Sequence, residues 1–230
     1  MIEVTGVQVP QEFNDMKLAE KWLARLPEKR ALQLGQIKKR DGFYLSLTAE
    51  VLARKSISEM TGYPFTEISI FHSDKGKPYV SEPGEIHFNN SHSGQWVVCA
   101  VSFSELGIDT EKIRPVNRDL AKRYFTETEY RYISDKKAEE WDSTFMEIWT
   151  AKEAYLKCLG KGLTLSLRSF SILTGDGKIR IRNNTTGTAI TGYNFQAIKG
   201  IDGHVTTLCA PANEKSCHFT TLDHRELFEV

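Results

Sequence analysis

The sequence has no excess charge of either sign and no long apolar run. Its 230 residues include 30 basic and 30 acidic side chains, so the formal net charge is zero. Without an overall positive field we expect no nucleic-acid partner. The longest clean apolar run, residues 96–101, is far shorter than the roughly 20 residues of a membrane span. We therefore expect no membrane partner either.

Cysteines are few, and the beginning of the chain has no basic segment. The four cysteines, at positions 99, 158, 209 and 217, show no CxxC spacing and no paired histidines. The first residues carry an acid at position 3 and do not resemble a signal peptide. We expect a reduced, cytoplasmic protein. With 40% apolar and 26% charged residues, the chain can bury a core and stay soluble.

The hydrophobic pattern predicts helices first and strands afterwards, twice along the chain. Apolar residues at helical spacing predict helices over 16–26 and 45–60, with a basic segment at 28–40 between them. Strands are predicted over 67–71, 86–89, 96–101 and 106–109. A polar stretch with Pro115 favours a boundary near residues 112–116, which gives an N-terminal half, 1–113, and a C-terminal half, 114–230.

The C-terminal half repeats this order. Helices are predicted over 119–125 and 127–133, followed by a third that contains residues 149–157, with Asp142 or Ser143 as its N-cap and Gly160 and Gly162 at its end. Hairpins are predicted around 175–177 and 200–203. The pattern predicts an α+β fold of two similarly built halves related by a pseudo-twofold axis, each with helices packed on a mostly antiparallel sheet.

Two pairs of charged residues are candidates for a catalytic site. Asp109 and Glu111, two apart at the end of a predicted strand, point to one side. Glu153 and Lys157, four apart on a predicted helix, share a face. Taken alone, the first pair fits a solvated strand end and the second a surface ion pair. Together, three carboxylates would suit a hard cation, Mg²⁺ or Ca²⁺.

Two further segments are candidates for holding an anion. A loop of small polar residues is predicted over 89–94, where Ser91 and His92 would offer a hydroxyl and an imidazole to a phosphate. Lys77 lies between Gly76 and Pro78, which would fix the direction of its side chain beside an anionic or aromatic ligand. Ordinary turns would explain both segments equally well.

These segments occur in the order GKP, FNxSHSG, GIDxE, FTxxE and WTxKEAxxK, followed by Gly160-Lys161-Gly162-Leu163. In this order the chain resembles the 4′-phosphopantetheinyl transferase superfamily, and most of all its long, two-half type, the surfactin synthetase-activating transferases. The likeness is close over residues 75–165. It implies a holo-[acyl-carrier-protein] synthase, a transferase that moves the 4′-phosphopantetheine arm of coenzyme A to a serine hydroxyl of an apo acyl or peptidyl carrier protein and releases adenosine 3′,5′-bisphosphate.

The resemblance also implies a role for each matching residue, with the active site in the cleft between the halves. Asp109, Glu111 and Glu153 would hold Mg²⁺. The catalytic residues would be Glu153 as general base, acting directly or through a water, Lys157 as the group that stabilises charge on the bridging oxygen or protonates it, and Glu129 as the group that orients a metal-bound water. Coenzyme A would be bound by five side chains: Lys77, Ser91, His92, Lys157 and Arg30.

Arg30 is included because the chain departs from the family's pattern. Leu45-Ser46 stands where relatives often carry an arginine for the 3′-phosphate of coenzyme A. The basic residues that could replace it are Lys29, Arg30, Lys38, Lys39 and Arg40. We expect a monomer, because the second half would supply what a partner subunit supplies in half-length relatives.

Two other functions use the same residues. A Mg²⁺-dependent hydrolase would cut a pyrophosphate with water and needs no protein acceptor. A non-catalytic module would bind coenzyme A or a carrier protein, although a binding module has no need of three converging carboxylates.

Overall fold

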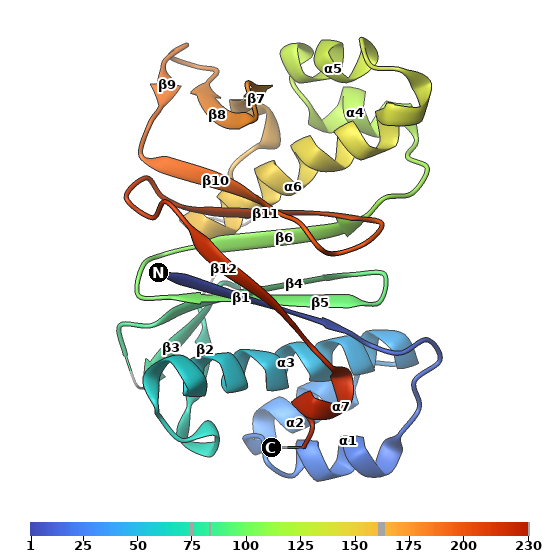
Figure 1. The fold of residues 1–230 in the computed structure, drawn as a ribbon, viewed down its shortest axis with the longest axis vertical. Helices are drawn as coiled ribbons and strands as arrows, with labels where there is room; N and C mark the ends of the chain where they lie inside the picture. The colour runs from blue at the N-terminus through green and yellow to red at the C-terminus, as the bar shows by residue number, and fades with distance from the viewer. Residues whose placement is uncertain (74–75, 83, 161–163, 230) are drawn as a thin grey trace.

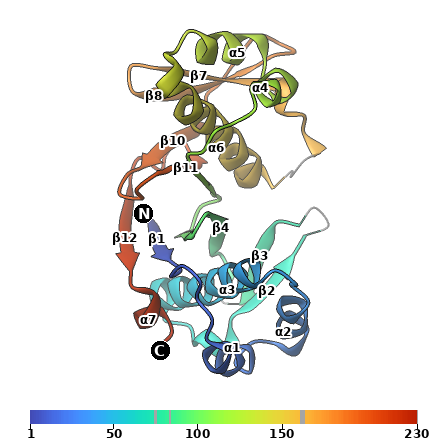
Figure 2. The ribbon, with the colours of Figure 1, turned by 90° about the vertical axis from the view of Figure 1, so that its right-hand side faces the viewer.

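The computed structural model describes residues 1–73, 76–82, 84–160 and 164–229. Its helices and mostly antiparallel sheets form two parts stacked along the long axis (Figures 1 and 2). The predicted α+β class is confirmed. The first part contains β1 (Ile2–Gln8), α1 (Met16–Leu23), α2 (Glu28–Gly35), α3 (Arg40–Thr61), β2 (Ser69–His72), β3 (Pro78–Glu82), β4 (His87–Ser93) and β5 (Trp96–Ser102).

The second part begins with β6 (Gly107–Lys112), α4 (Arg118–Tyr124), α5 (Glu127–Ser134) and α6 (Trp141–Leu159). It continues with β7 (Phe170–Gly175), β8 (Lys178–Asn183), β9 (Ala189–Ile190), β10 (Tyr193–Ile198) and β11 (His204–Pro211). The chain then returns to the first part with β12 (Cys217–Leu222) and α7 (His224–Leu227). Among the described helices, none is long and apolar enough to cross a membrane.

The same order of elements recurs in the two parts. In each, a strand leads through short helices to one long helix, α3 or α6, and then through a hairpin to an antiparallel strand pair. The first strand then pairs with the last: β1 with β5, and β6 with β11. This recurrence is the arrangement expected of two similarly built halves.

Two elements cross the boundary predicted near residue 113. Strand β6 lies before it in sequence but pairs with β11 of the second part. Strand β12 lies after it but pairs in parallel with β1 of the first part, and α7 follows there. The division at 113 stays a prediction, and the sheets tie the two parts together across it.

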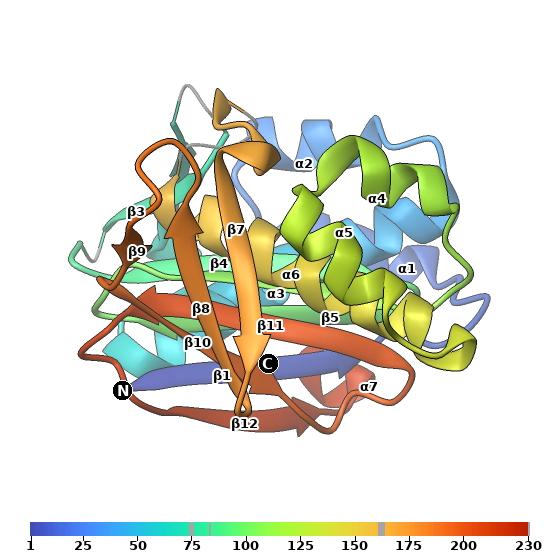
Figure 3. The same cartoon turned by 90° about the horizontal axis from the view of Figure 1, so that it is seen from above.

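Four layers are visible in Figure 1: α6, the sheet β10-β11-β6, the sheet β12-β1-β5-β4, and α3. Each long helix has an apolar cluster beneath it. A third cluster fills the space between the sheets, where Ile108 and Leu208 pack with Val98 and Ala100. Seen from above, the β7–β8 hairpin and helices α4 and α5 lie on the outer side of α6 (Figure 3).

Several predicted boundaries need correction. Helix α3 begins at Arg40, five residues before the predicted start. The N-cap of α6 is Glu140 rather than Asp142 or Ser143. The Asp142 carboxylate instead accepts a hydrogen bond from the Val116 amide at 3.0 Å, which fixes the chain entering the second part.

The predicted C-terminus of α6 is confirmed at one of its two glycines. Gly160 ends the helix in the left-handed conformation, with φ 63°. Gly162 lies outside the described residues.

Candidate active site

Strands β4 and β6, one from each part, lie side by side and are joined by side chains instead of a backbone ladder (Figure 1). Three hydrogen bonds, each from an amide of β6 to a side chain of β4, run from Ile108 N to Asn89 Oδ1 at 2.9 Å, from Thr110 N to Ser91 Oγ at 3.2 Å, and from Lys112 N to Ser93 Oγ at 3.1 Å. The loop predicted over residues 89–94 is therefore wrong. The alternating polar side chains lie on one face of a strand, where they accept hydrogen bonds from the backbone amides of β6.

Gly107 brings α6 against β6. A Cβ atom at this position would collide with the carbonyl oxygen of Ala154 and the amide nitrogen of Cys158. Only a glycine allows the helix to come so close. Because alternate residues of a strand share a face, Asp109 and Glu111 point to the same side as Gly107, toward the helix that carries Glu153 and Lys157.

Asp109 is the predicted metal ligand with the most hydrogen bonds among the described residues. The residue is only 5% exposed. Oδ1 accepts hydrogen bonds from Ser91 Oγ at 2.9 Å and from Lys157 Nζ at 2.7 Å. Lys157 also donates to the carbonyl of Ile108 at 2.9 Å. The ion pair of Lys157 is thus with Asp109 on β6, and it joins α6 to the strand.

Glu153 lies close enough to the other carboxylates to feel their charge. Burial raises the pKa of its side chain, and the negative charges of Asp109 and Glu111 raise it further, whereas Lys157 opposes them. Glu111 in turn accepts a hydrogen bond from Ser93 Oγ at 2.7 Å. The three predicted metal ligands therefore lie close enough for the charges of Asp109 and Glu111 to act on Glu153.

The donor set can be tested against Mg²⁺ on this geometry. Asp109 Oδ2 is buried and has no hydrogen-bond partner among the described residues. An acceptor in that position suits a cation. No three acidic, histidine or cysteine side chains of the described chain form a closed ligand group. Because Mg²⁺ keeps several waters and needs only one or two protein carboxylates beside substrate phosphates, the open arrangement fits this ion.

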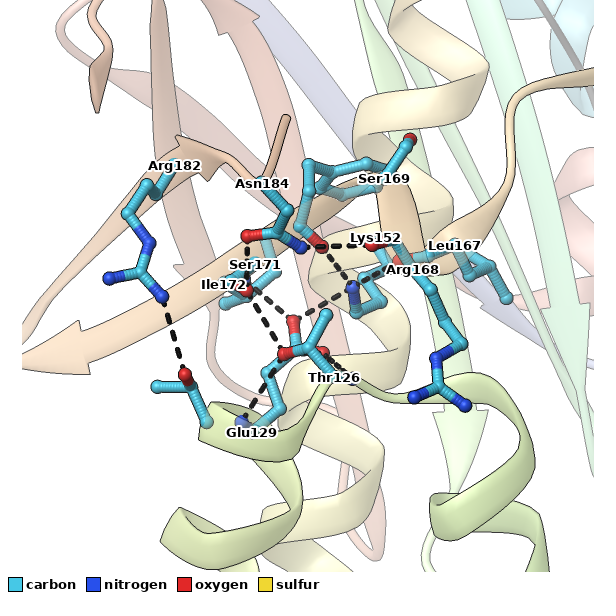
Figure 4. A network of polar contacts seen from close by, with 12 residues as sticks. Thr126, Glu129, Lys152, Leu167, Arg168, Ser169, Ser171, Ile172, Arg182 and Asn184 are labelled. Atoms are coloured by element: carbon cyan, nitrogen blue, oxygen red, sulfur yellow. Dashed lines mark hydrogen bonds and ion pairs between the residues drawn. The ribbon is translucent and has the colours of Figure 1, made fainter. Parts of the chain in front are cut away.

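Glu129 is not brought to this cluster. It forms an ion pair with Lys152, at 2.8 Å between Oε1 and Nζ, in which neither side chain is exposed (Figure 4). Its oxygens also accept hydrogen bonds from the amides of Thr126 and Ile172 and from the Thr126 hydroxyl. Its predicted role in orienting a metal-bound water stays a prediction, and its contacts support a structural role.

Lys152 completes this buried network. Its ammonium donates to the carbonyls of Leu167 at 2.6 Å and Phe170 at 2.8 Å. The pair thus ties α6 to the start of α5 and to the segment that enters β7, as Figure 4 shows. Because Lys152 directly precedes Glu153, this anchoring fixes the rotation of α6 about its own axis next to Glu153.

Lys77 reaches from the first part to the end of α6. Its ammonium donates to the carbonyl of Cys158 at 2.8 Å and lies 3.8 Å from Glu105. With Asn90 and Lys157 it lines a hollow of about 270 Å³. Lys77 and Lys157 therefore line the same hollow.

Of the remaining predicted side chains for coenzyme A, His92 lies near the charges of Lys157 and Asp109, whereas Arg30 lies apart. Partial burial lowers the pKa of His92, and the positive charge of Lys157 lowers it further. Arg30 Nε donates to Glu50 at 2.8 Å and lines a separate hollow of about 470 Å³ beside Lys29. Arg30 thus does not join the cluster around Asp109.

Sequence reasoning missed the structural part played by Asn89, Ser93 and Gly107. The alternation Asn89, Ser91, Ser93 was the available signal for a strand, because polar residues at every second position indicate a polar face. Nothing in the sequence showed that this face would meet the backbone of β6.

Comparison with known proteins identifies the family of the chain. Residues 105–209 match the profile of the 4′-phosphopantetheinyl transferase superfamily, and residues 15–104 match that of the 4′-phosphopantetheinyl transferase N-terminal domain. The first match begins just before β6 and the second ends just after β5. Between them the two profiles cover both parts of the cluster around Asp109.

Three bacterial relatives carry the name 4′-phosphopantetheinyl transferase. The gsp protein of Aneurinibacillus migulanus is 33% identical over 200 residues, which cover 87% of this chain and 83% of that protein. Sfp of Bacillus subtilis strain 168 is 38% identical over 67% of this chain and 69% of its own length. Another Bacillus subtilis transferase is 40% identical over 59% of this chain and 61% of that protein. The chain belongs to the 4′-phosphopantetheinyl transferase superfamily, and the predicted family is confirmed.

Proposed function

We propose that this protein transfers the 4′-phosphopantetheine arm of coenzyme A to a serine hydroxyl of an apo carrier protein and releases adenosine 3′,5′-bisphosphate. One observation carries the proposal. Asp109 of β6 is held by Ser91 and by Lys157 of α6, and its second carboxylate oxygen is buried without a partner among the described residues. A buried acceptor beside an ammonium is suited to a pyrophosphate and its cation.

Asp109, Glu111 and Glu153 would hold Mg²⁺ in this proposal. When bound, the ion would neutralise negative charge on the pyrophosphate. The unpartnered oxygen of Asp109 is available for it, since the other oxygen already accepts two hydrogen bonds. Lys157, held on two oxygens of β6, would place its positive charge beside the oxygen that leaves with adenosine 3′,5′-bisphosphate.

Glu153 would take the proton from the carrier's serine as its oxygen attacks the phosphorus that bears the pantetheine arm. A carboxylate is an effective base when its pKa lies near the working pH. Burial and the two neighbouring carboxylates raise the pKa of Glu153 in that direction. The bond from phosphorus to the bridging oxygen breaks in the same reaction.

Coenzyme A would bind along the hollow lined by Lys77, Asn90 and Lys157, with His92 close by. Arg30 remains a candidate for the 3′-phosphate only if it leaves Glu50, to which it is bonded. A charge-reversing test at this position, Arg30→Glu, should raise KM for coenzyme A if the residue serves that phosphate.

The carrier protein would dock on α4 and the chain leading to it. Ile113 and Leu120 are exposed there, 38% and 40%, among exposed basic side chains, namely Arg114, Arg118, Lys122 and Arg123. An apolar patch with basic surroundings suits an acidic partner. Leu120→Asp should therefore raise KM for the carrier and leave KM for coenzyme A unchanged. The expected monomer and cytoplasmic location belong to this proposal.

Mass spectrometry of the carrier tests the proposal directly. The protein is incubated with coenzyme A, an unmodified carrier protein and Mg²⁺, and in parallel with EDTA. A carrier that gains the phosphopantetheine arm only with Mg²⁺ supports the proposal. Coenzyme A cleaved beside an unchanged carrier would indicate a hydrolase. An unchanged mixture across several acyl and peptidyl carriers would indicate a binding module.

A further inference from the structure

Ser93 holds the carboxylate of Glu111, as Ser91 holds that of Asp109. Ser93 Oγ donates to Glu111 Oε2 at 2.7 Å and accepts from the amide of Lys112 at 3.1 Å. Unlike Ser91, however, Ser93 is the last residue of β4. Ser93 pairs with Trp96 of β5 across the turn, and a contact from another element would hold it from its other side.

His204, at the start of β11, supplies that hold. Its Nε2 lies 3.0 Å from the carbonyl oxygen of Ser93, and its Nδ1 lies 2.9 Å from the carbonyl oxygen of Asp202. Carbonyl oxygens only accept, so a neutral ring, with its one N–H, donates to one of the two, and the tautomer with the proton on Nε2 donates to Ser93. The ring lies between the turn that precedes β11 and the end of β4.

The backbone around this ring leaves little freedom. Gly94, which follows Ser93, has φ 59°, and a Cβ there would lie 3.1 Å from both His204 Nε2 and Lys112 Cδ. His204 is also the cross-strand partner of Lys112 in the β11–β6 pair. The imidazole therefore lies where β4 and β6, the two strands of the candidate site, end together.

We propose that His204 is a positioning residue for the cation site: it fixes Ser93, and Ser93 fixes Glu111 in the orientation that a divalent cation needs. The proposal rests on the proposed function in taking Glu111 as a cation ligand. A hydrogen bond that orients a ligand typically changes metal affinity about 10–100-fold when it is removed. His204 lies outside all the motifs that suggested the activity.

The test measures Mn²⁺ binding by electron paramagnetic resonance in the presence of coenzyme A, in the full chain. We expect Ser93→Ala and His204→Gln to weaken Mn²⁺ binding, Ser93→Ala by about tenfold and His204→Gln by a smaller factor. His218→Gln is the matched control, because His218 also makes a hydrogen bond, with the carboxylate of Glu3 at 2.9 Å, but lies on β12. It should bind Mn²⁺ as the wild type does.

The double variant separates positioning from simple stability. If His204 acts through the hydroxyl of Ser93, adding His204→Gln to Ser93→Ala should weaken Mn²⁺ binding no further. Two losses that multiply would overturn the proposal, as would unchanged Mn²⁺ binding in His204→Gln with a lowered melting temperature. Unchanged binding in Glu111→Gln would also overturn it.

The transfer assay with the wild type keeps the two proposals apart. A wild type that transfers the arm, beside a His204→Gln variant with unchanged Mn²⁺ affinity, contradicts only the role of His204. A wild type that modifies no carrier contradicts the proposed function itself.

Discussion

Gly107 lies so close beneath α6 that a Cβ there would collide with the carbonyl oxygen of Ala154. This contact sets the distance between the strand of Asp109 and the helix of Glu153. Gly107→Ala should therefore push α6 away, at a cost of about 1–3 kcal/mol in the free energy of unfolding. Because Asp109 and Glu153, the proposed catalytic groups, separate too, kcat should fall by about 100-fold. Urea unfolding and the carrier assay measure the two effects.

Gly175→Ala is the control for this prediction. Gly175 ends β7, and a Cβ there would meet nothing within 4 Å. The free energy of unfolding of the Gly175→Ala variant should change by less than about 0.5 kcal/mol, and its kcat should equal that of the wild type. A Gly107→Ala variant with wild-type kcat would show that the helix position is not set by this contact.

Glu129 and Lys152 offer a second prediction, because neither side chain reaches solvent. Glu129→Ala should lower the free energy of unfolding by about 3–5 kcal/mol, since it leaves the ammonium of Lys152 buried without its counter-charge. Glu129→Leu combined with Lys152→Met should cost less than the sum of the single changes. A urea-unfolding double-mutant cycle measures this coupling.

The exposed pair of Glu127 with Arg131, at 2.8 Å on the same helix, is the control. Glu127→Gln should cost less than about 1 kcal/mol. Glu129→Gln also separates the structural role from the catalytic one predicted for this residue. Wild-type stability with abolished transfer would favour the catalytic role, whereas lowered stability with retained transfer in the folded fraction would favour the structural one.

What the sequence could predict was local. Two carboxylates two residues apart share a face of any strand, so the common orientation of Asp109 and Glu111 needed no tertiary information. The hairpin at Gly175–Gly177 depends on its turn residues, and β7 pairs with β8 around it. Gly160 ends α6 for the same kind of local reason.

What the sequence could not predict depends on contacts between distant segments. Strand β1 pairs with β12, joining Ile2 to Cys217, and no short-range pattern signals a parallel partner so far along the chain. Glu129 is a related case. Its position in FTxxE matched a motif, but the motif does not show that Lys152 of α6 would occupy its carboxylate.

Asn89 gives a third prediction, on the junction between the two parts. It is 5% exposed, and its Oδ1 accepts the hydrogen bond from the amide of Ile108 at 2.9 Å. Asn89→Ala would leave that buried amide without an acceptor, so the free energy of unfolding should fall by about 1–3 kcal/mol. Asn213→Ala, at an exposed position, should change it by less than about 0.5 kcal/mol. Equal stability of the two variants would contradict the role given to the side-chain ladder.

Glu153 gives the last prediction, because the arrangement that suits a base also costs stability. Burial and the charges of Asp109 and Glu111 raise the pKa of its carboxyl in the folded chain. In the unfolded chain the value returns to about 4.3. Between these two values the folded state binds more protons than the unfolded state, so its stability falls as the pH rises through this window. Above the raised pKa the full cost is present.

Glu153→Gln removes this titration. With EDTA present, the variant should be more stable than the wild type at pH 7.5, and the advantage should shrink as the pH falls toward 4, where both side chains are neutral. Urea unfolding at several pH values measures the difference. The same variant should lose at least about 100-fold in transfer, because no base remains to take the serine proton. A variant that is less stable at pH 7.5 would contradict the crowding of carboxylates, and wild-type turnover would contradict the role of Glu153 as the base.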